Sequence, residues 1–298
     1  MNKNSMETIR PLSVGNVVSS GLTLYRSNLN RYFGVAVKAI LWLIPGFLSF
    51  ILIPIMMAVS GNNGFIVFIA GIISFIGLLF FAGRSMASQA LISRLAYQEI
   101  INQPETVSEA EKKVYPKTWN FVGMTVSVIL RIYGLYILMI FTLIIPIIIG
   151  TQNQIFAAFL MGLAIVFLGI WTIIHFISRW FVSEVVLAVE DGLNGGASMQ
   201  RSWDLSKGAV GRLQSIVFVA FLVTLPVQTI TGFLPSLFFG SPTPGTSSFF
   251  FAQFVSLIFS LIGSLFVIPF WQSIKAVIYY DLRSRIEGID LQLRSNLR

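Results

Sequence analysis

The chain has 298 residues, of which 55% are hydrophobic and only 11% are charged, and its formal net charge is +8. Soluble domains carry about 25% charged residues, so this composition and a mean hydropathy of +0.82 exclude a soluble globular protein and favour one that lies in lipid. The chain has no cysteine and one histidine, which excludes disulfides, thiolate zinc sites and cysteine nucleophiles and leaves mainly carboxylates for a metal centre.

Residues 1–32 predict a cytoplasmic N-terminal amphipathic helix. They contain no short apolar core followed by small residues, so we expect no cleaved signal peptide. Ser13 can cap this helix at its amino end. Six of the residues that follow are spaced so that they lie on one face of the helix. The residues of this face are Val14, Val17, Val18, Gly21, Leu22 and Tyr25.

Six apolar blocks are long enough to cross the hydrocarbon core of a bilayer, which takes about 20 residues of helix. The blocks are residues 33–59, 65–82, 132–149, 155–178, 216–239 and 249–278. They fall into three pairs, because short connectors alternate with long polar segments. We therefore predict an all-α integral membrane protein, a single membrane domain over residues 1–298 with about six transmembrane helices in three hairpins and cytoplasmic amphipathic helices.

The basic residues predict the orientation of the six spans. All 20 lysines and arginines lie before the first pair, between pairs, after the last pair or at the adjoining ends of spans, and the connectors within pairs carry none. By the positive-inside rule, the long loops, both termini and the tail at 279–298 are cytoplasmic. We expect a multi-pass protein of a bacterial cytoplasmic (inner) membrane. The acidic residues follow the same partition, so charge-dependent chemistry belongs to the cytoplasmic side.

The segment between the second and third spans predicts a short cytoplasmic helix. Ser108 and Glu111 have the spacing of a capping box, and Glu109 stands four residues before Lys113, where an ion pair can form on a helix. Pro116 should end this helix.

A weak internal repeat accompanies the three pairs of spans. A short polar helix, a basic turn and the next span follow one another in residues 25–35, 113–124 and 203–216. This pattern favours three related hairpins, although any hairpin with cytoplasmic charges shares these features, and both interpretations stay open.

Few residues within the spans could carry chemistry. His175 would need an ionisable partner to relay protons, and the spans supply none, so an interfacial histidine is favoured. Arg131 is expected to extend its guanidinium to the head groups. Hydroxyl and amide residues of the last two spans could line a polar path or form hydrogen bonds between helices. These residues are Gln228, Thr229, Thr231, Gln253 and Gln272, beside the small residues Ser256, Ser260, Gly263 and Ser264.

Glu184 and Glu190 are the best candidates for a carboxylate site. Their spacing of six residues does not place them on one helical face, so an acid/base pair is not indicated, and salt bridges to Arg179 or Arg201 are favoured. No Walker, Ser-His-Asp, zinc-helix or dinucleotide-binding motif occurs. We therefore predict no catalytic, cofactor-binding or metal-binding residue, and no cofactor.

A mixture of aromatic and basic residues predicts where a ligand could bind. Tryptophan and tyrosine favour the membrane interface, and lysine and arginine attract anionic lipids. The candidate lipid- or partner-binding residues are Arg201, Trp203, Lys207, Arg212, Tyr280, Asp281, Arg283 and Arg285. The alternative is that these residues only anchor the helices. The expected partners are anionic head groups on the cytoplasmic side, with a membrane protein as a second candidate partner and no nucleic acid.

Three stretches resemble a known family. They are residues 11–15 (PLSVG) with 24–26 (LYR), residues 201–205 (RSWDL), and residues 279–283 (YYDLR) with Arg285, Glu287, Gly288 and Asp290. This pattern resembles the membrane domain of some bacterial glycerophosphoryl diester phosphodiesterases and its stand-alone uncharacterised relatives. The resemblance covers nearly the whole chain and implies a membrane fold. In those enzymes catalysis belongs to a soluble barrel with histidines and metal-binding carboxylates, which this chain lacks, so no activity is carried over.

These observations favour a non-enzymatic bacterial membrane protein that binds lipid or a partner as a scaffold or accessory protein. A transporter or channel subunit is the first alternative, and the lack of ionisable residues at mid-bilayer counts against ion coupling. A lipid-modifying enzyme that uses Glu184, Glu190 or His175 at the interface is the second.

Overall fold

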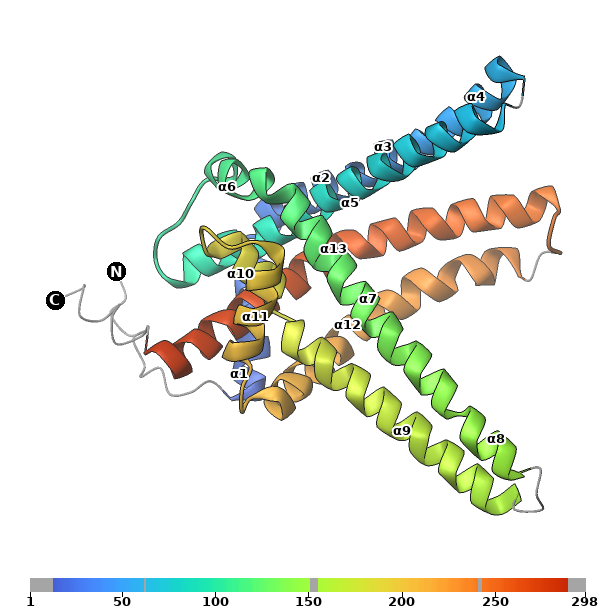
Figure 1. The fold of residues 1–298 in the computed structure, drawn as a ribbon. Helices are drawn as coiled ribbons and strands as arrows, with labels where there is room; N and C mark the ends of the chain where they lie inside the picture. Colours follow the sequence, from blue (N-terminus) through green and yellow to red (C-terminus); the bar gives the residue numbers. More distant parts are fainter. Residues whose placement is uncertain (1–12, 62, 151–154, 241–242, 289–298) are drawn as a thin grey trace.

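The computed structural model describes residues 13–61, 63–150, 155–240 and 243–288. Within these ranges the chain forms helices and no strand. Three long helical hairpins diverge from one compact end, as Figure 1 shows. The predicted all-α membrane fold is confirmed, because six helical segments are long and apolar enough to cross a membrane. These segments are Leu29–Ser60, Gly64–Ile100, Val107–Ile148, Ile155–Val189, Val210–Phe239 and Ser247–Glu287.

Each hairpin has a first arm that leaves the compact end and a second arm that returns to it. In the first hairpin the outgoing arm is broken where Pro45 and Pro54 remove backbone donors. It consists of α2 (Leu29–Leu41), α3 (Leu43–Leu48), the 3-10 turn η1 (Ser49–Ile51) and α4 (Leu52–Ser60). The chain returns through α5 (Gly64–Ile100).

The second and third hairpins repeat this course. The second leaves through α7 (Thr118–Thr142) and α8 (Ile144–Gly150), and returns through α9 (Ile155–Trp180) and the short α10 (Ser183–Val189). The third consists of α12 (Val210–Phe239) and α13 (Ser247–Glu287). The last apolar block ends at residue 278, and α13 continues beyond it as a charged helix to Glu287.

A short helix precedes each hairpin, as the predicted repeat requires. These helices are α1 (Val14–Ser27), α6 (Val107–Val114) and α11 (Gly195–Leu205), with the 3-10 turn η2 (Tyr115–Lys117) after α6. The order of elements is therefore the same in three consecutive units of the chain.

Side chains are buried at the compact end and exposed along the hairpins. In the most apolar 18-residue stretch of each span, at most 17% of the residues are buried. The core instead joins the second half of α5, α10 and the second half of α13, where Leu91, Leu187 and Ile274 are fully buried. The hairpins thus present apolar surface to lipid, and the compact end holds the three units together.

Helix ends show which local predictions hold. The Ser13 hydroxyl accepts a hydrogen bond from the Asn16 amide at 3.1 Å, so the predicted cap of α1 is confirmed. The capping box of α6 is formed by Thr106 and Glu109, and the prediction of Ser108 with Glu111 is wrong. The helix begins at Val107, which leaves Ser108 inside its first turn, where its backbone is already helical.

Candidate functional site

The sequence-predicted site residues lie around the compact end, but they do not form one open basic surface. Arg201 of α11 lies between two carboxylates: its Nε is 3.2 Å from Glu190 Oε1, and its guanidinium also pairs with Glu287 of α13. The predicted salt bridge between Glu190 and Arg201 is therefore confirmed. Lys207, in the turn after α11, pairs with Asp204 at 2.8 Å on the surface.

The remaining candidates also have partners. Arg212 pairs with Asp281, and Arg285 Nε lies 3.0 Å from the same carboxylate, whose side chain is 5% exposed. Arg283 Nε lies 2.9 Å from Glu287 Oε2, and Arg283 also donates to the Tyr97 hydroxyl. Tyr280 is buried in the core. All five cations of the predicted set therefore have carboxylate partners. The ion pairs of Arg201 and Arg212 join separate helices, whereas the carboxylate partners of Lys207, Arg283 and Arg285 lie three or four residues away in sequence.

Glu184 is part of a polar cluster between the three core segments. Its carboxylate accepts a hydrogen bond of 2.9 Å from the Gln272 amide and pairs with Lys275, both on α13. Ser93 of α5 donates to the backbone carbonyl of Gln272 at 3.1 Å. For Glu184, the prediction of a salt bridge to Arg179 or Arg201 is wrong. Its true partner lies 91 residues away in sequence, on a helix that only tertiary packing brings near.

Glu190 completes the link between α10 and α13. Besides Arg201, it accepts a hydrogen bond of 2.7 Å from the hydroxyl of Tyr279, which is fully buried. Both carboxylates are thus occupied by donors from α13. Such pairing fixes how α10 and α13 lie against each other, which is a structural role.

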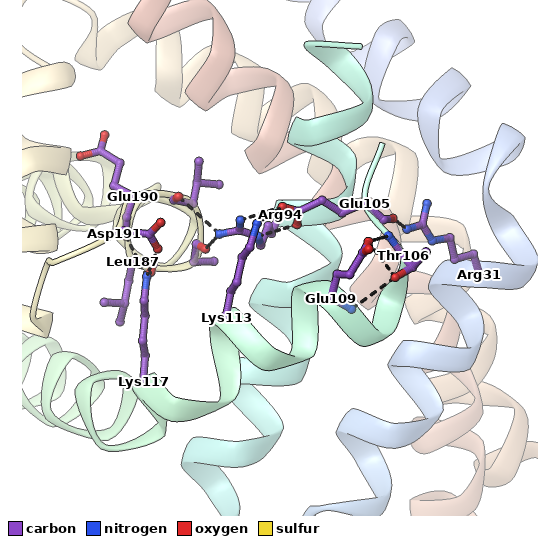
Figure 2. A network of polar contacts seen from close by, with 12 residues as sticks. Arg31, Arg94, Glu105, Thr106, Glu109, Lys113, Lys117, Leu187, Glu190 and Asp191 are labelled. Atoms are coloured by element: carbon purple, nitrogen blue, oxygen red, sulfur yellow. Dashed lines mark hydrogen bonds and ion pairs between the residues drawn. The ribbon is translucent and has the colours of Figure 1, made fainter. Parts of the chain in front are cut away.

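A second network, shown in Figure 2, fastens the carboxyl end of α10. Arg94, whose side chain is 3% exposed, grips Glu105 through Nε at 2.8 Å and Nη2 at 3.0 Å. Its Nη1 donates to the carbonyl of Ala188 at 2.6 Å. Lys113 pairs with Glu105 rather than with Glu109 as predicted, because Glu109 is occupied by the capping box. Hydrogen bonds from Arg94 and Lys113 lower the pKa of Glu105 to about 2.

A basic residue at the start of each outgoing arm contacts the end of the returning arm in the same unit. Arg31 of α2 donates to the carbonyl of Glu105, shortly after α5. Lys117 donates to the carbonyls of Leu187 at 3.0 Å and Glu190 at 2.8 Å, at the carboxyl end of α10. Arg212 pairs with Asp281 of α13. Cations are favoured near helix carboxyl ends, so these contacts close each unit at its base (Figure 2 shows the first two).

Three other arginines lie where the spans meet the compact end, and aromatic rings hold them. The guanidinium of Arg84 lies 4.0 Å from the ring centre of Tyr115 and 5.1 Å from that of Trp42. Arg179 lies 4.2 Å from Trp203.

Arg131 is the third of these arginines, 5.4 Å from the ring centre of Trp180. Among the described residues, no aspartate or glutamate lies within ion-pair distance of any of the three. We call Arg84, Arg131 and Arg179 the interfacial arginines.

A pocket of about 520 Å³ opens beside one of these arginines, between α7, α9 and α11. We call it the interfacial pocket. Its lining residues are Arg131, Gly134, Leu135, Leu138, Phe176, Trp180, Gly196, Met199, Gln200 and Trp203. Trp203 is the one predicted site residue that lines it. The sequence signal that could have found the pocket is Arg131, a charged residue thirteen positions after the start of α7 at Thr118.

Most polar residues of the third hairpin form hydrogen bonds within their own helix. Gln228 donates to Thr224 of its own helix at 3.2 Å, and Ser256 and Ser264 donate to carbonyls one turn back. A Cβ at Gly263 would lie 2.8 Å from the Thr231 side chain, so α12 and α13 approach each other closely there. A pocket of about 370 Å³ adjoins these residues, but Gln272 lies apart from it, in the core.

Two remaining predictions concern chemistry. His175 is half-buried and lies against Phe176, with ring centres 6.2 Å apart. Across the described ranges, no group of three histidine, aspartate or glutamate side chains is placed to hold a metal. No family model, curated protein or solved structure matches this chain.

Proposed function

We propose that this chain is a non-enzymatic scaffold or accessory protein of the bacterial inner membrane that binds anionic lipid head groups at its compact end. In this proposal the compact end and both termini face the cytoplasm, in keeping with the positive-inside rule. The resemblance to the membrane domain of glycerophosphoryl diester phosphodiesterases supports a role in the membrane and adds no catalytic activity.

The observation that carries the proposal is the contrast between two sets of cations. The five cations of the predicted set are neutralised by carboxylates of the chain, whereas the interfacial arginines rest on aromatic rings. A cation near the bilayer needs a counter-charge, and anionic head groups supply one at this depth. The interfacial arginines are therefore the better candidates for lipid contact, and the predicted set fastens the helices.

Replacing two interfacial arginines tests the proposal. In R84Q/R179Q, two of the positive charges that face the head groups are lost, and each contributes about 1 kcal/mol near an anionic surface. We expect the ratio of anionic to zwitterionic lipid that co-purifies in mild detergent to fall about thirtyfold. The ratio is measured by mass spectrometry of lipids extracted from the purified protein.

Two further variants make this result specific. R26Q/K112Q removes two exposed cations of α1 and α6 and should lower the ratio much less. R84K/R179K keeps the charge and should retain most of the lipid, which separates loss of charge from misfolding. A folded R84Q/R179Q protein with an unchanged lipid ratio would refute the proposal.

A further inference from the structure

We propose that the interfacial pocket is a specific site for one anionic phospholipid, with the phosphate on Arg131 and an acyl chain along Leu135 and Leu138. The inference rests on the proposed function and deepens it, because it turns a general attraction for anionic lipid into one defined site with a defined ligand class.

Arg131 has hydrogen-bonding capacity that the chain leaves unused. A guanidinium carries five N–H donors, and the polar contact found for this one is with the sulfur of Met199 at 3.9 Å. Thioether sulfur is a weak acceptor. The other contact, with the face of Trp180, leaves the edge of the guanidinium open. Paired N–H groups on that edge match two oxygens of a phosphate, the acceptor arginine binds best.

The polarity of the pocket lining also favours an anion. Arg131 is the one charged residue among the residues that line the pocket, so no carboxylate there would repel an anion. Gln200 adds an amide, and Trp180 and Trp203 add indole N–H groups that can donate to hydroxyl or ester oxygens. A volume of about 520 Å³ lies within the range of pockets that hold small ligands.

The order of polar and apolar residues along the pocket distinguishes a lipid from a soluble phosphate compound. Arg131, Leu135 and Leu138 are spaced by four and three residues, so they lie along one face of α7. The cation stands toward α11 and the compact end, and the leucines follow toward the membrane. Polar groups at one end and apolar groups at the other match the two parts of a phospholipid.

Arg179 adds rigidity to this arrangement. It does not line the pocket, but its guanidinium stacks on Trp203 at 4.2 Å and donates to the carbonyl of Trp203 at 3.3 Å. Trp203 also packs near Phe176 and Trp180, with ring centres 5.4 Å and 6.1 Å away. The aromatic wall is thus held in place before a ligand enters, which limits the entropy lost on binding.

Gly134 offers a way to fill the pocket without disturbing the fold. No atom lies within 4 Å of where its Cβ would be, so the leucine of G134L would extend into the pocket. Leucine is also a better helix former than glycine. Gly123 lies on the same helix, equally open and outside the pocket lining, so G123L is the matched control.

The experiment measures phosphatidylglycerol bound to the purified full chain by native mass spectrometry, in detergent micelles that contain equal amounts of phosphatidylglycerol and phosphatidylcholine. We expect one tightly held phosphatidylglycerol on the wild type and on G123L. G134L should weaken this binding at least about tenfold, and R131Q should do the same because it removes a charged hydrogen bond. R131K should bind with intermediate strength, since it keeps the charge without the planar fork.

Each other outcome overturns the inference. Phosphatidylglycerol bound equally by wild type, G134L and R131Q would place the lipid elsewhere. Equal retention of phosphatidylcholine would refute the anionic preference. Displacement of the lipid by millimolar inorganic phosphate would assign the site to a soluble phosphate. If R84Q/R179Q loses anionic lipid while G134L keeps it, the inference fails and the proposed function stands; a wild type without anionic enrichment refutes both.

Discussion

Arginine occupies three kinds of environment in this molecule, and the partner decides the role. Arg94 is almost fully buried and forms a bidentate ion pair with Glu105. It also donates a hydrogen bond to the carbonyl of Ala188 in α10. Arg201 bridges carboxylates of two helices. Arg131 meets an indole ring and a sulfur atom, and its charge is left for a ligand. Counting basic residues in the sequence cannot separate these cases, because the partners lie far apart in the chain.

The lowered pKa of Glu105 predicts how the free energy of unfolding depends on pH. Hydrogen bonds from Arg94 and Lys113 lower its pKa to about 2, below the ordinary 4.5. The unfolded chain therefore binds more protons at Glu105 between these values. The stability from this group is fully present above pH 4.5 and is lost as the pH falls toward 2. Unfolding of the purified protein in detergent, followed by circular dichroism across this range, measures the loss.

The variant E105Q tests the same contact at neutral pH. It leaves the buried charge of Arg94 without a carboxylate, so we expect a loss of about 2 kcal/mol in the free energy of unfolding, and a smaller pH dependence between 4.5 and 2. D191N is the control, because Asp191 is a largely exposed partner of Lys117 and should change stability by at most about 1 kcal/mol. Equal effects of both variants would contradict the assignment.

Close approach between α11 and α7 depends on one glycine. A Cβ at Gly195 would lie 2.5 Å from the carbonyl oxygen of Asn120 and 3.0 Å from the amide nitrogen of Met124, both in the backbone of α7. Backbone atoms cannot move aside as a flexible side chain can. G195A should therefore lower the free energy of unfolding by about 1–3 kcal/mol, the usual cost of overpacking.

The neighbouring glycine provides the control for this prediction. At Gly196 the nearest atom to a new Cβ is a side-chain oxygen of Asn194 at 3.5 Å, an ordinary contact. G196A should change stability by less than about 1 kcal/mol, and in the favourable direction, because alanine is the better helix former. Chemical unfolding of both variants in the same detergent compares them directly. A destabilised G196A with an unaffected G195A would contradict the close approach of the two helices at Gly195.

Sequence patterns predicted whole elements better than their ends. The six spans follow from runs of apolar residues that a bilayer requires, and each predicted block coincides with one structural segment. The predicted second block ended at residue 82, but α5 continues to Ile100, because its later turns bury small and apolar residues in the core. Thr106 with Glu109 and Ser108 with Glu111 both have the capping-box spacing, and local pattern alone cannot choose between them.

The candidate site was predictable only in part. Of the residues that the aromatic and basic composition singled out, Trp203 lines the interfacial pocket. The ion pairs of Arg212 with Asp281 and of Lys275 with Glu184 join residues 69 and 91 positions apart. Only the assembled fold reveals which cations the carboxylates neutralise. It therefore also reveals that, among the described residues, Arg131 stands beside the pocket without a carboxylate partner.

At the scale of the whole molecule, the three units are joined mainly at their bases. Figure 1 shows the hairpins spreading away from the compact end, where α5, α10 and α13 pack together. The contacts of Arg31, Lys117 and Arg212 close each unit there. Lipid can therefore surround each hairpin, while the network of ion pairs at the base sets how the units are arranged. A ligand bound at the interfacial pocket would contact α7 and α9 of the second unit and α11 of the third unit together.

The orientation of the molecule predicts a labelling pattern that the absence of cysteine makes simple to measure. Asn63 and Thr246 are exposed N-cap residues of α5 and α13, in the connectors of the first and third hairpins, whereas the exposed Gln103 follows α5 and the exposed Asn194 caps α11. Because the basic residues of the described ranges belong to the compact side, that side should face the cytoplasm. An impermeant thiol reagent should react in intact cells with single cysteines placed at Asn63 and Thr246. It should also react with a cysteine at Gln152 in the second connector, which lies outside the described residues. Cysteines at Gln103 and Asn194 should react only after the membrane is opened. The reverse pattern would invert the orientation and move the interfacial arginines to the outer leaflet, and labelling of both groups in intact cells would mean that one span does not cross.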